Sequence, residues 1–180
     1  MTKTILRRLL LISVVVAMLT MSTTSAHAAL IKATNQHQYQ QYSNWCWAAS
    51  ACSIIPNQSG SGGPSQSSFV QATLGNQNNV GATIIQVRYT MEFYYGVIGS
   101  IYAGSLSLSA IKSHINSNEP VYVAVMWSGG GGHAVVVSGY YDNNNDVYVM
   151  DPYYGWQITS YSNMVSNYLG SGSWSSCIRL

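Results

Sequence analysis

Apolar residues recur every three or four positions in several stretches of the chain, the spacing that places them on one face of a helix. These stretches predict helices over residues 45–54, 65–74, 84–95 and 108–118. Asn44 can cap the first helix, and Pro56 should end it. Gly75 and Gly96 should end the next two, and Pro120 cannot continue the fourth.

Segments rich in β-branched and aromatic residues dominate the second half of the chain. The expected strands cover residues 97–102, 121–127, 133–141, 147–150 and 174–180, and a short helix is expected around 161–168. The polar run 142–146 favours a hairpin between the third and fourth of these strands. Helices that come early and strands that come late are typical of an α+β protein, here an N-terminal helical lobe followed by an antiparallel sheet lobe.

The first 28 residues carry the pattern of a secretory signal peptide. A basic start precedes an apolar run over residues 9–19, and Ala26-His27-Ala28, with a small residue at each end, matches a cleavage site. The apolar run is shorter than the roughly 20 residues of a membrane-spanning helix. We therefore expect cleavage after residue 28, export to the periplasm or the exterior, and a single domain over residues 29–180 that is not held in a membrane.

Charge is scarce and nearly balanced, with seven Lys or Arg and five Asp or Glu residues. Three of the basic residues, Lys3, Arg7 and Arg8, lie in the expected signal peptide. The remaining four basic and five acidic residues give the mature domain a net charge of −1. This balance provides no basic surface for nucleic acid or for an anionic membrane.

Cys46 lies at the expected N-terminus of the first helix, between Trp45 and Trp47. A cysteine nucleophile reacts as the thiolate, which a helix N-terminus stabilises. The free amides of the first turn could also bind an oxyanion formed by attack on a carbonyl. Taken alone, this context favours a small buried hydrophobic residue over a nucleophile.

His133 follows the glycine run 129–132 and begins an apolar strand, so its side chain can face an open cleft. The alternative is a flexible loop that contains an incidental histidine. Asp151 ends the following strand, where its carboxylate can orient the imidazole as in other catalytic triads. His37 and His114 have no comparable position.

Strand register provides a test of the pairing between His133 and Asp151, because side chains on a strand alternate between two faces. Asp151 shares a face with His133 only if it lies opposite Val135 or another odd-numbered residue. That register leaves an odd number of residues in the hairpin loop. We therefore expect an odd loop, or a β-bulge that restores the parity.

Three separate segments resemble those of the papain-like cysteine peptidases. They are Gln40 with Trp45-Cys46-Trp47-Ala48-Ala49, then Gly132-His133-Ala134-Val135-Val136-Val137, then Asp151-Pro152. The similarity is to short bacterial members, such as staphopain-like enzymes and effector proteases of plant pathogens. It implies a papain-like fold and a secreted cysteine peptidase that acts on a protein or peptide substrate.

The resemblance also implies a role for each matching residue. Cys46 corresponds to the nucleophile that forms a thioester acyl-enzyme, and His133 to its base and acid. Asp151 corresponds to the orienting residue, where papain itself has asparagine, and Gln40 to the oxyanion-hole side chain. Residues 29–39 leave no room for a long inhibitory propeptide, so control of activity is expected from export, a separate inhibitor or a partner.

Cys52 and Cys177 remain once Cys46 is assigned. A pair of cysteines in an exported chain favours a disulfide, here between the first helix and the last strand. The alternative is two buried thiols.

No cofactor or metal is expected. The run 142–146 lacks the glycine and glutamate of a calcium loop, and Cys46 and His133 lack the second close pair of a zinc site. The other functions open at this point are a cell-wall amidase or endopeptidase on the same scaffold, an acyl transferase or transglutaminase with the same triad, and a non-catalytic secreted binding module.

Overall fold

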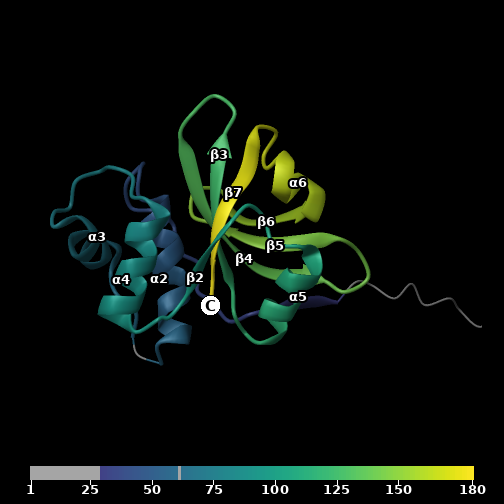
Figure 1. Ribbon diagram of the computed structural model, residues 1–180, viewed down its shortest axis with the longest axis horizontal. Helices are drawn as coiled ribbons and strands as arrows, with labels where there is room; N and C mark the ends of the chain where they lie inside the picture. Colours follow the sequence, from purple (N-terminus) through teal and green to yellow (C-terminus); the bar gives the residue numbers. More distant parts are fainter. Residues whose placement is uncertain (1–28, 61) are drawn as a thin grey trace, which may run out of the picture.

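The structure is a computed structural model that describes residues 29–60 and 62–180 and shows two lobes (Figure 1). The expected signal peptide, residues 1–28, lies outside the described residues. One lobe consists of the helices α2 (Cys46–Gln58), α3 (Gln66–Leu74) and α4 (Ile84–Tyr95). The other contains the sheet together with α5 (Leu108–Asn116) and α6 (Tyr161–Ser166). Among the described residues, no helix has the length and apolar character needed to cross a bilayer.

The sheet has seven antiparallel strands in the described part of the chain, in the order β2-β7-β3-β4-β5-β6, with β1 paired to β4. Their bounds are β1 Leu30–Lys32, β2 Ser100–Ala103, β3 Val121–Trp127, β4 Gly132–Tyr141, β5 Asp146–Asp151, β6 Gly155–Ser160 and β7 Gly172–Arg179. The α+β class and the division into a helical lobe and a sheet lobe are therefore confirmed.

Local capping explains most of the helix boundaries. The N-cap side chains of Ser65, Thr83 and Ser107 each accept a hydrogen bond from the amide three residues later. Gly75 and Gly96 end α3 and α4 in the left-handed conformation that glycine adopts easily. These boundaries agree with the prediction from the sequence.

Helix α2 differs from its prediction at both ends. Its N-cap is Trp45, because the side chain of Asn44 is already bonded to the backbone of Asn79. Pro56 lies inside the helix, which continues to Gln58 and is followed by a bond from Ser59 N to Ile55 O. A proline in the last turn removes a single intrahelical bond, which the packed helix tolerates.

Strands β3, β4, β5 and β7 agree with the prediction to within two residues, whereas β2 is shorter than expected. Strands β1 and β6 were not predicted. β1 has three residues and exists only through its pairing with β4, a contact that periodicity cannot indicate. β6 follows a turn of three residues after Asp151, too close to β5 for the sequence to separate the two.

Two hydrophobic clusters pack on opposite faces of the sheet, as the alternation along β4 requires. Ala134 and Val136 belong to the cluster shared with the helical lobe, and Val135 and Val137 to the other. Cys52 lies in the first cluster and Cys177 in the second. The sheet therefore separates these thiols, and the expected disulfide is wrong: all three cysteines are free.

Candidate active site

Cys46 is the first residue of α2, and it is partly exposed, whereas residues 47–55 of the helix are buried. The N-cap residue, Trp45, makes no side-chain hydrogen bond to the first turn of α2. The first intrahelical bond is made by Ala49 N to Trp45 O, so the amides before it are free of intrahelical partners. The thiol therefore lies beside a group of available N–H donors.

The two tryptophans that flank Cys46 fix the loop opposite it. Trp45 donates its indole N–H to Asn78 O (3.0 Å) and Trp47 donates to Val80 O (3.1 Å). This loop continues into residues 81–84, which line the cleft. The sequence identified both tryptophans only as neighbours of Cys46 and gave no sign that their N–H groups hold a loop.

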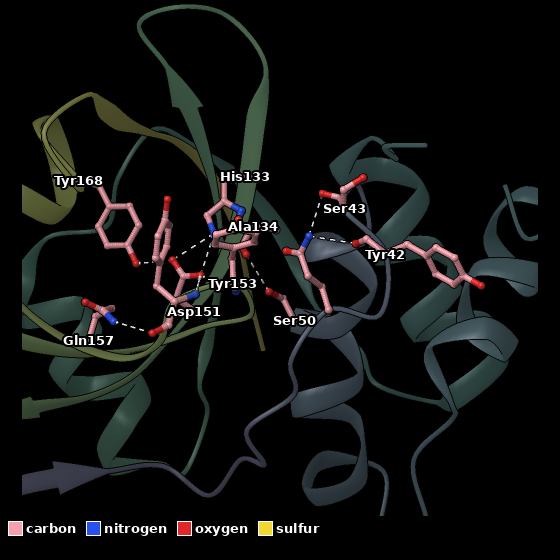
Figure 2. A network of polar contacts seen from close by, with 11 residues as sticks. Tyr42, Ser43, Ser50, His133, Ala134, Asp151, Tyr153, Gln157 and Tyr168 are labelled. Carbon is pink, nitrogen blue, oxygen red and sulfur yellow. Dashed lines mark hydrogen bonds and ion pairs between the residues drawn. The ribbon is translucent and has the colours of Figure 1, made fainter. Parts of the chain in front are cut away.

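His133 and Asp151 form a buried pair at the neighbouring ends of β4 and β5. His133 Nε2 lies 3.0 and 3.1 Å from the two carboxylate oxygens of Asp151 (Figure 2). The side chain of Asp151 is fully buried, and that of His133 is 8% exposed. The contact leaves Nδ1 as the ring nitrogen available to a nucleophile.

Of the two expected ways to bring Asp151 onto the face of His133, an odd loop or a β-bulge, the structure confirms the bulge. Val136 pairs with Met150 and Val137 with Val149, and extending this register by one residue places Asp151 opposite Val135. The register then shifts between Val137 and Gly139, which leaves Ser138 as the extra residue. The bulge compensates for a loop with an even number of residues, 142–145, and keeps Asp151 on the face of His133.

Opposing effects set the protonation of the pair. Burial lowers the pKa of His133, but hydrogen bonds to Asp151 and Cys46 and the negative charges of both raise it to about 9. Burial raises the pKa of Asp151, whereas hydrogen bonds and the charge of His133 outweigh it and hold the pKa below its usual value. At neutral pH the pair is therefore imidazolium and carboxylate, with Cys46 close enough to interact with the ring.

A cleft of about 770 Å³ brings the predicted residues together. Cys46, His133 and Gln40 line it, while Asp151 lies behind His133 and does not. Ser50, one turn after Cys46, donates its hydroxyl to Ala134 O (3.0 Å), which ties α2 to the strand of His133 (Figure 2). Among the described residues, no group of three His, Cys, Asp or Glu side chains could hold a metal ion.

Gln40 occupies the cleft but is engaged elsewhere. Its amide nitrogen donates to Tyr42 O (3.0 Å) and Ser43 O (2.8 Å). Its Oε1 is buried with no hydrogen-bond partner among the described residues. The position of Gln40 fits an oxyanion-hole residue, but its N–H groups would have to turn away from these carbonyls to act as one.

Two further side chains, those of Tyr168 and Trp127, contact the pair, and the sequence indicated neither contact. Tyr168 donates its hydroxyl to Asp151 Oδ2 (2.7 Å). Trp127 stacks on His133, with ring centroids 5.7 Å apart. Both are long-range contacts to aromatic residues that the sequence assigned to a strand and a short helix, and no local signal distinguishes them from core residues.

A helix with a cysteine in its first turn, facing a histidine–aspartate pair across a cleft between a helical and a sheet lobe, defines the class of papain-like cysteine peptidases. The family model described as papain-like cysteine protease AvrRpt2 matches residues 26–169. The chain belongs to this family and is a hydrolase of the papain-like cysteine peptidase class. A search of curated proteins gave no significant match.

Solved structures support the same fold. A double glycine motif protease from an AMS/PCAT transporter, in complex with the leader peptide, has a TM-score of 0.57 at 18% identity, covering 82% of this chain and 91% of that one. UfSP from C. elegans has a TM-score of 0.54 at 15% identity, covering 91% of this chain. The match spans 36% of the UfSP chain. At these identities the likeness concerns the fold.

Proposed function

We propose that this protein is an exported peptidase in which Cys46 is the nucleophile, His133 its base and acid, and Asp151 the residue that orients His133. The observation that carries the proposal is the geometry of one cleft. It combines a thiol beside free helix amides with an imidazole that a buried carboxylate keeps protonated.

The reaction follows from these positions. The Cys46 thiolate attacks the scissile carbonyl carbon, and the π-electron pair moves onto oxygen, where helix amides receive it. When the intermediate collapses, the C–N bond breaks and the His133 imidazolium gives its proton to the leaving amine. Neutral His133 then takes a proton from water, and the hydroxide attacks the thioester. The C–S bond breaks, which restores thiolate and imidazolium.

Gln40 supplies a second oxyanion donor in this proposal. Its Nε2 gives up the bond to Tyr42 O or Ser43 O and turns one hydrogen toward the developing charge. The unpaired Oε1 supports such a rotation, because no hydrogen bond of that oxygen has to break.

An extended peptide is the substrate that fits best. The cleft runs between two lobes, and a structure of similar fold was solved with a leader peptide bound. The signal-like residues 1–28 support export, after which the peptidase would act outside the cytoplasm.

The test is hydrolysis of casein or peptides by residues 29–180, with labelling by a thiol-reactive inhibitor of papain-type enzymes. We expect label on Cys46, and a loss of activity of at least roughly 1,000-fold in Cys46→Ala. Cys52→Ala is the matched control, since burial raises the pKa of the Cys52 thiol to about 12 and keeps it unreactive. Turnover of peptidoglycan alone would instead indicate an amidase, and no labelling with no turnover would indicate a binding module.

A further inference from the structure

Asp151 is a buried charge that depends on a full set of donors. Its carboxylate accepts bonds from Tyr153 N (2.8 Å), Tyr154 N (3.0 Å), the Tyr168 hydroxyl (2.7 Å) and His133 Nε2. The two backbone donors belong to its own turn and bind Oδ1. The hydroxyl of Tyr168 comes from a distant part of the chain and binds Oδ2, which His133 Nε2 also contacts (Figure 2). With the amides on Oδ1 and this hydroxyl on Oδ2, the rotation of the carboxylate is fixed.

Tyr168 is itself held on all sides. Its side chain is fully buried in the second hydrophobic cluster. Its backbone exchanges two bonds of 2.8 Å with Gly172, across a tight turn in which Leu169 and Gly170 adopt positive φ. A residue anchored in this way places its hydroxyl at one point, unlike a surface tyrosine.

Trp127 links Tyr168 to the other member of the pair. Its ring lies 5.7 Å from that of His133 and 6.4 Å from that of Tyr168, tilted by 22° in each case. Tyr168 thus reaches Asp151 through a hydrogen bond and His133 through a stacked ring. The carboxylate limits movement of the imidazole in its plane, and the indole limits tilt out of it.

The proton of Tyr168 is not available for exchange in the reaction. Burial and the charge of Asp151 raise the pKa of the phenol far above its usual value, so the hydroxyl remains a donor. Tyr168 also does not line the cleft. It cannot touch a substrate bound there.

We propose that Tyr168 is a positioning residue of the active site: its hydroxyl sets the orientation and the charge of Asp151, and through them the imidazole of His133. This inference rests on the proposed peptidase mechanism. It extends the triad by a fourth side chain, contributed by the segment between α6 and β7.

The test compares Tyr168→Phe with Tyr140→Phe in residues 29–180. Tyr140 is also a buried tyrosine, and its hydroxyl bonds Asn116 Oδ1 (2.9 Å) away from the cleft. Without the Tyr168 donor the pKa of Asp151 should rise, which NMR of the labelled carboxyl carbon measures without any substrate. We further expect kcat to fall roughly ten-fold with KM unchanged. Tyr140→Phe should change neither the pKa of Asp151 nor kcat.

A purely structural role for Tyr168 would lower stability alone. If Tyr168→Phe left the Asp151 titration and kcat at the values of Tyr140→Phe, the inference would be overturned. If Tyr168→Phe does not fold, the wild-type protein decides instead: the Tyr168 hydroxyl proton should exchange slowly and shift as Asp151 titrates, and fast exchange with no such shift would contradict the proposal. Neither NMR measurement, the Asp151 titration or the exchange of the Tyr168 hydroxyl proton, depends on whether the protein hydrolyses peptides.

Discussion

At the scale of residues, the site depends on a histidine and an aspartate whose burial disfavours the charged form of each side chain. Each would tend to become neutral if buried alone, and each is held charged by the other together with further donors. A buried pair of this kind is sensitive to the loss of one member, because the remaining charge is left uncompensated.

Asp151→Asn should therefore lower the pKa of His133 from about 9 toward its usual value. The variant keeps the size of the side chain but removes the negative charge, an effect of roughly one to three pKa units for a close ion pair. The measurement is an NMR titration of the ¹⁵N-labelled imidazole. Asp146→Asn, at the opposite end of β5, is the control. A pKa that stays near 9 in Asp151→Asn would show that the carboxylate does not hold the proton.

The raised pKa of His133 also predicts how the free energy of unfolding depends on pH. A pKa of about 9 in the folded state exceeds the ordinary value of 6.5, so protonated His133 stabilises the fold below pH 6.5. That contribution is lost as the pH rises through 9. Urea unfolding of the wild type should show a loss of roughly 2–3 kcal/mol between pH 7 and pH 10. The loss should be smaller in Asp151→Asn, and equal losses in both proteins would contradict the assignment.

At the scale of elements, α2 and β4 must keep a fixed distance for Cys46 to meet His133. Beyond the shared hydrophobic packing, a hydrogen bond joins them, from Ser50 on α2 to Ala134 O on β4, beside His133. Both residues are buried, so the carbonyl has no access to water if the hydroxyl is removed.

Ser50→Ala should lower both stability and kcat. Leaving the carbonyl of Ala134 unsatisfied costs about 1–3 kcal/mol, and the loss of the tie between α2 and β4 lets Cys46 move relative to His133. Ser53→Ala is the matched control, because Ser53 is equally buried and its hydroxyl donates to Ser50 O within its own helix. Chemical unfolding and kcat measure the two effects. A variant Ser50→Ala with the kcat of Ser53→Ala would show that this tie does not position the nucleophile.

Elements with local signals could be predicted from the sequence. Gly75 and Gly96 indicated the ends of α3 and α4, the polar run 142–146 indicated the hairpin, and the alternation of faces along a strand led to the parity rule for Asp151. Contacts between distant segments could not be predicted. The pairing of β1, the Tyr168–Asp151 bond and the separation of Cys52 from Cys177 by the sheet depend on how elements pack, which periodicity does not contain.

At the scale of the whole molecule, two lobes each contribute half of the site. The helical lobe provides Cys46 and the loop held by Trp45 and Trp47, and the sheet lobe provides His133 and Asp151. The arm before α2 joins the lobes through Gln40 N to Pro152 O (2.9 Å), next to Asp151. The proposed active site therefore forms only when the two lobes are packed together.

The most direct test of this account is the rate at which iodoacetamide alkylates Cys46 across pH 5 to 9, measured by mass spectrometry in the wild type and in His133→Ala. Cys46 should be alkylated much faster in the wild type than in His133→Ala, because the imidazolium of His133 lies close enough to interact with the thiol. His133→Ala should lose this reactivity, and Cys52 and Cys177 should stay unlabelled in both folded proteins. Equal rates and equal pH profiles in the wild type and His133→Ala would contradict the proposed pair.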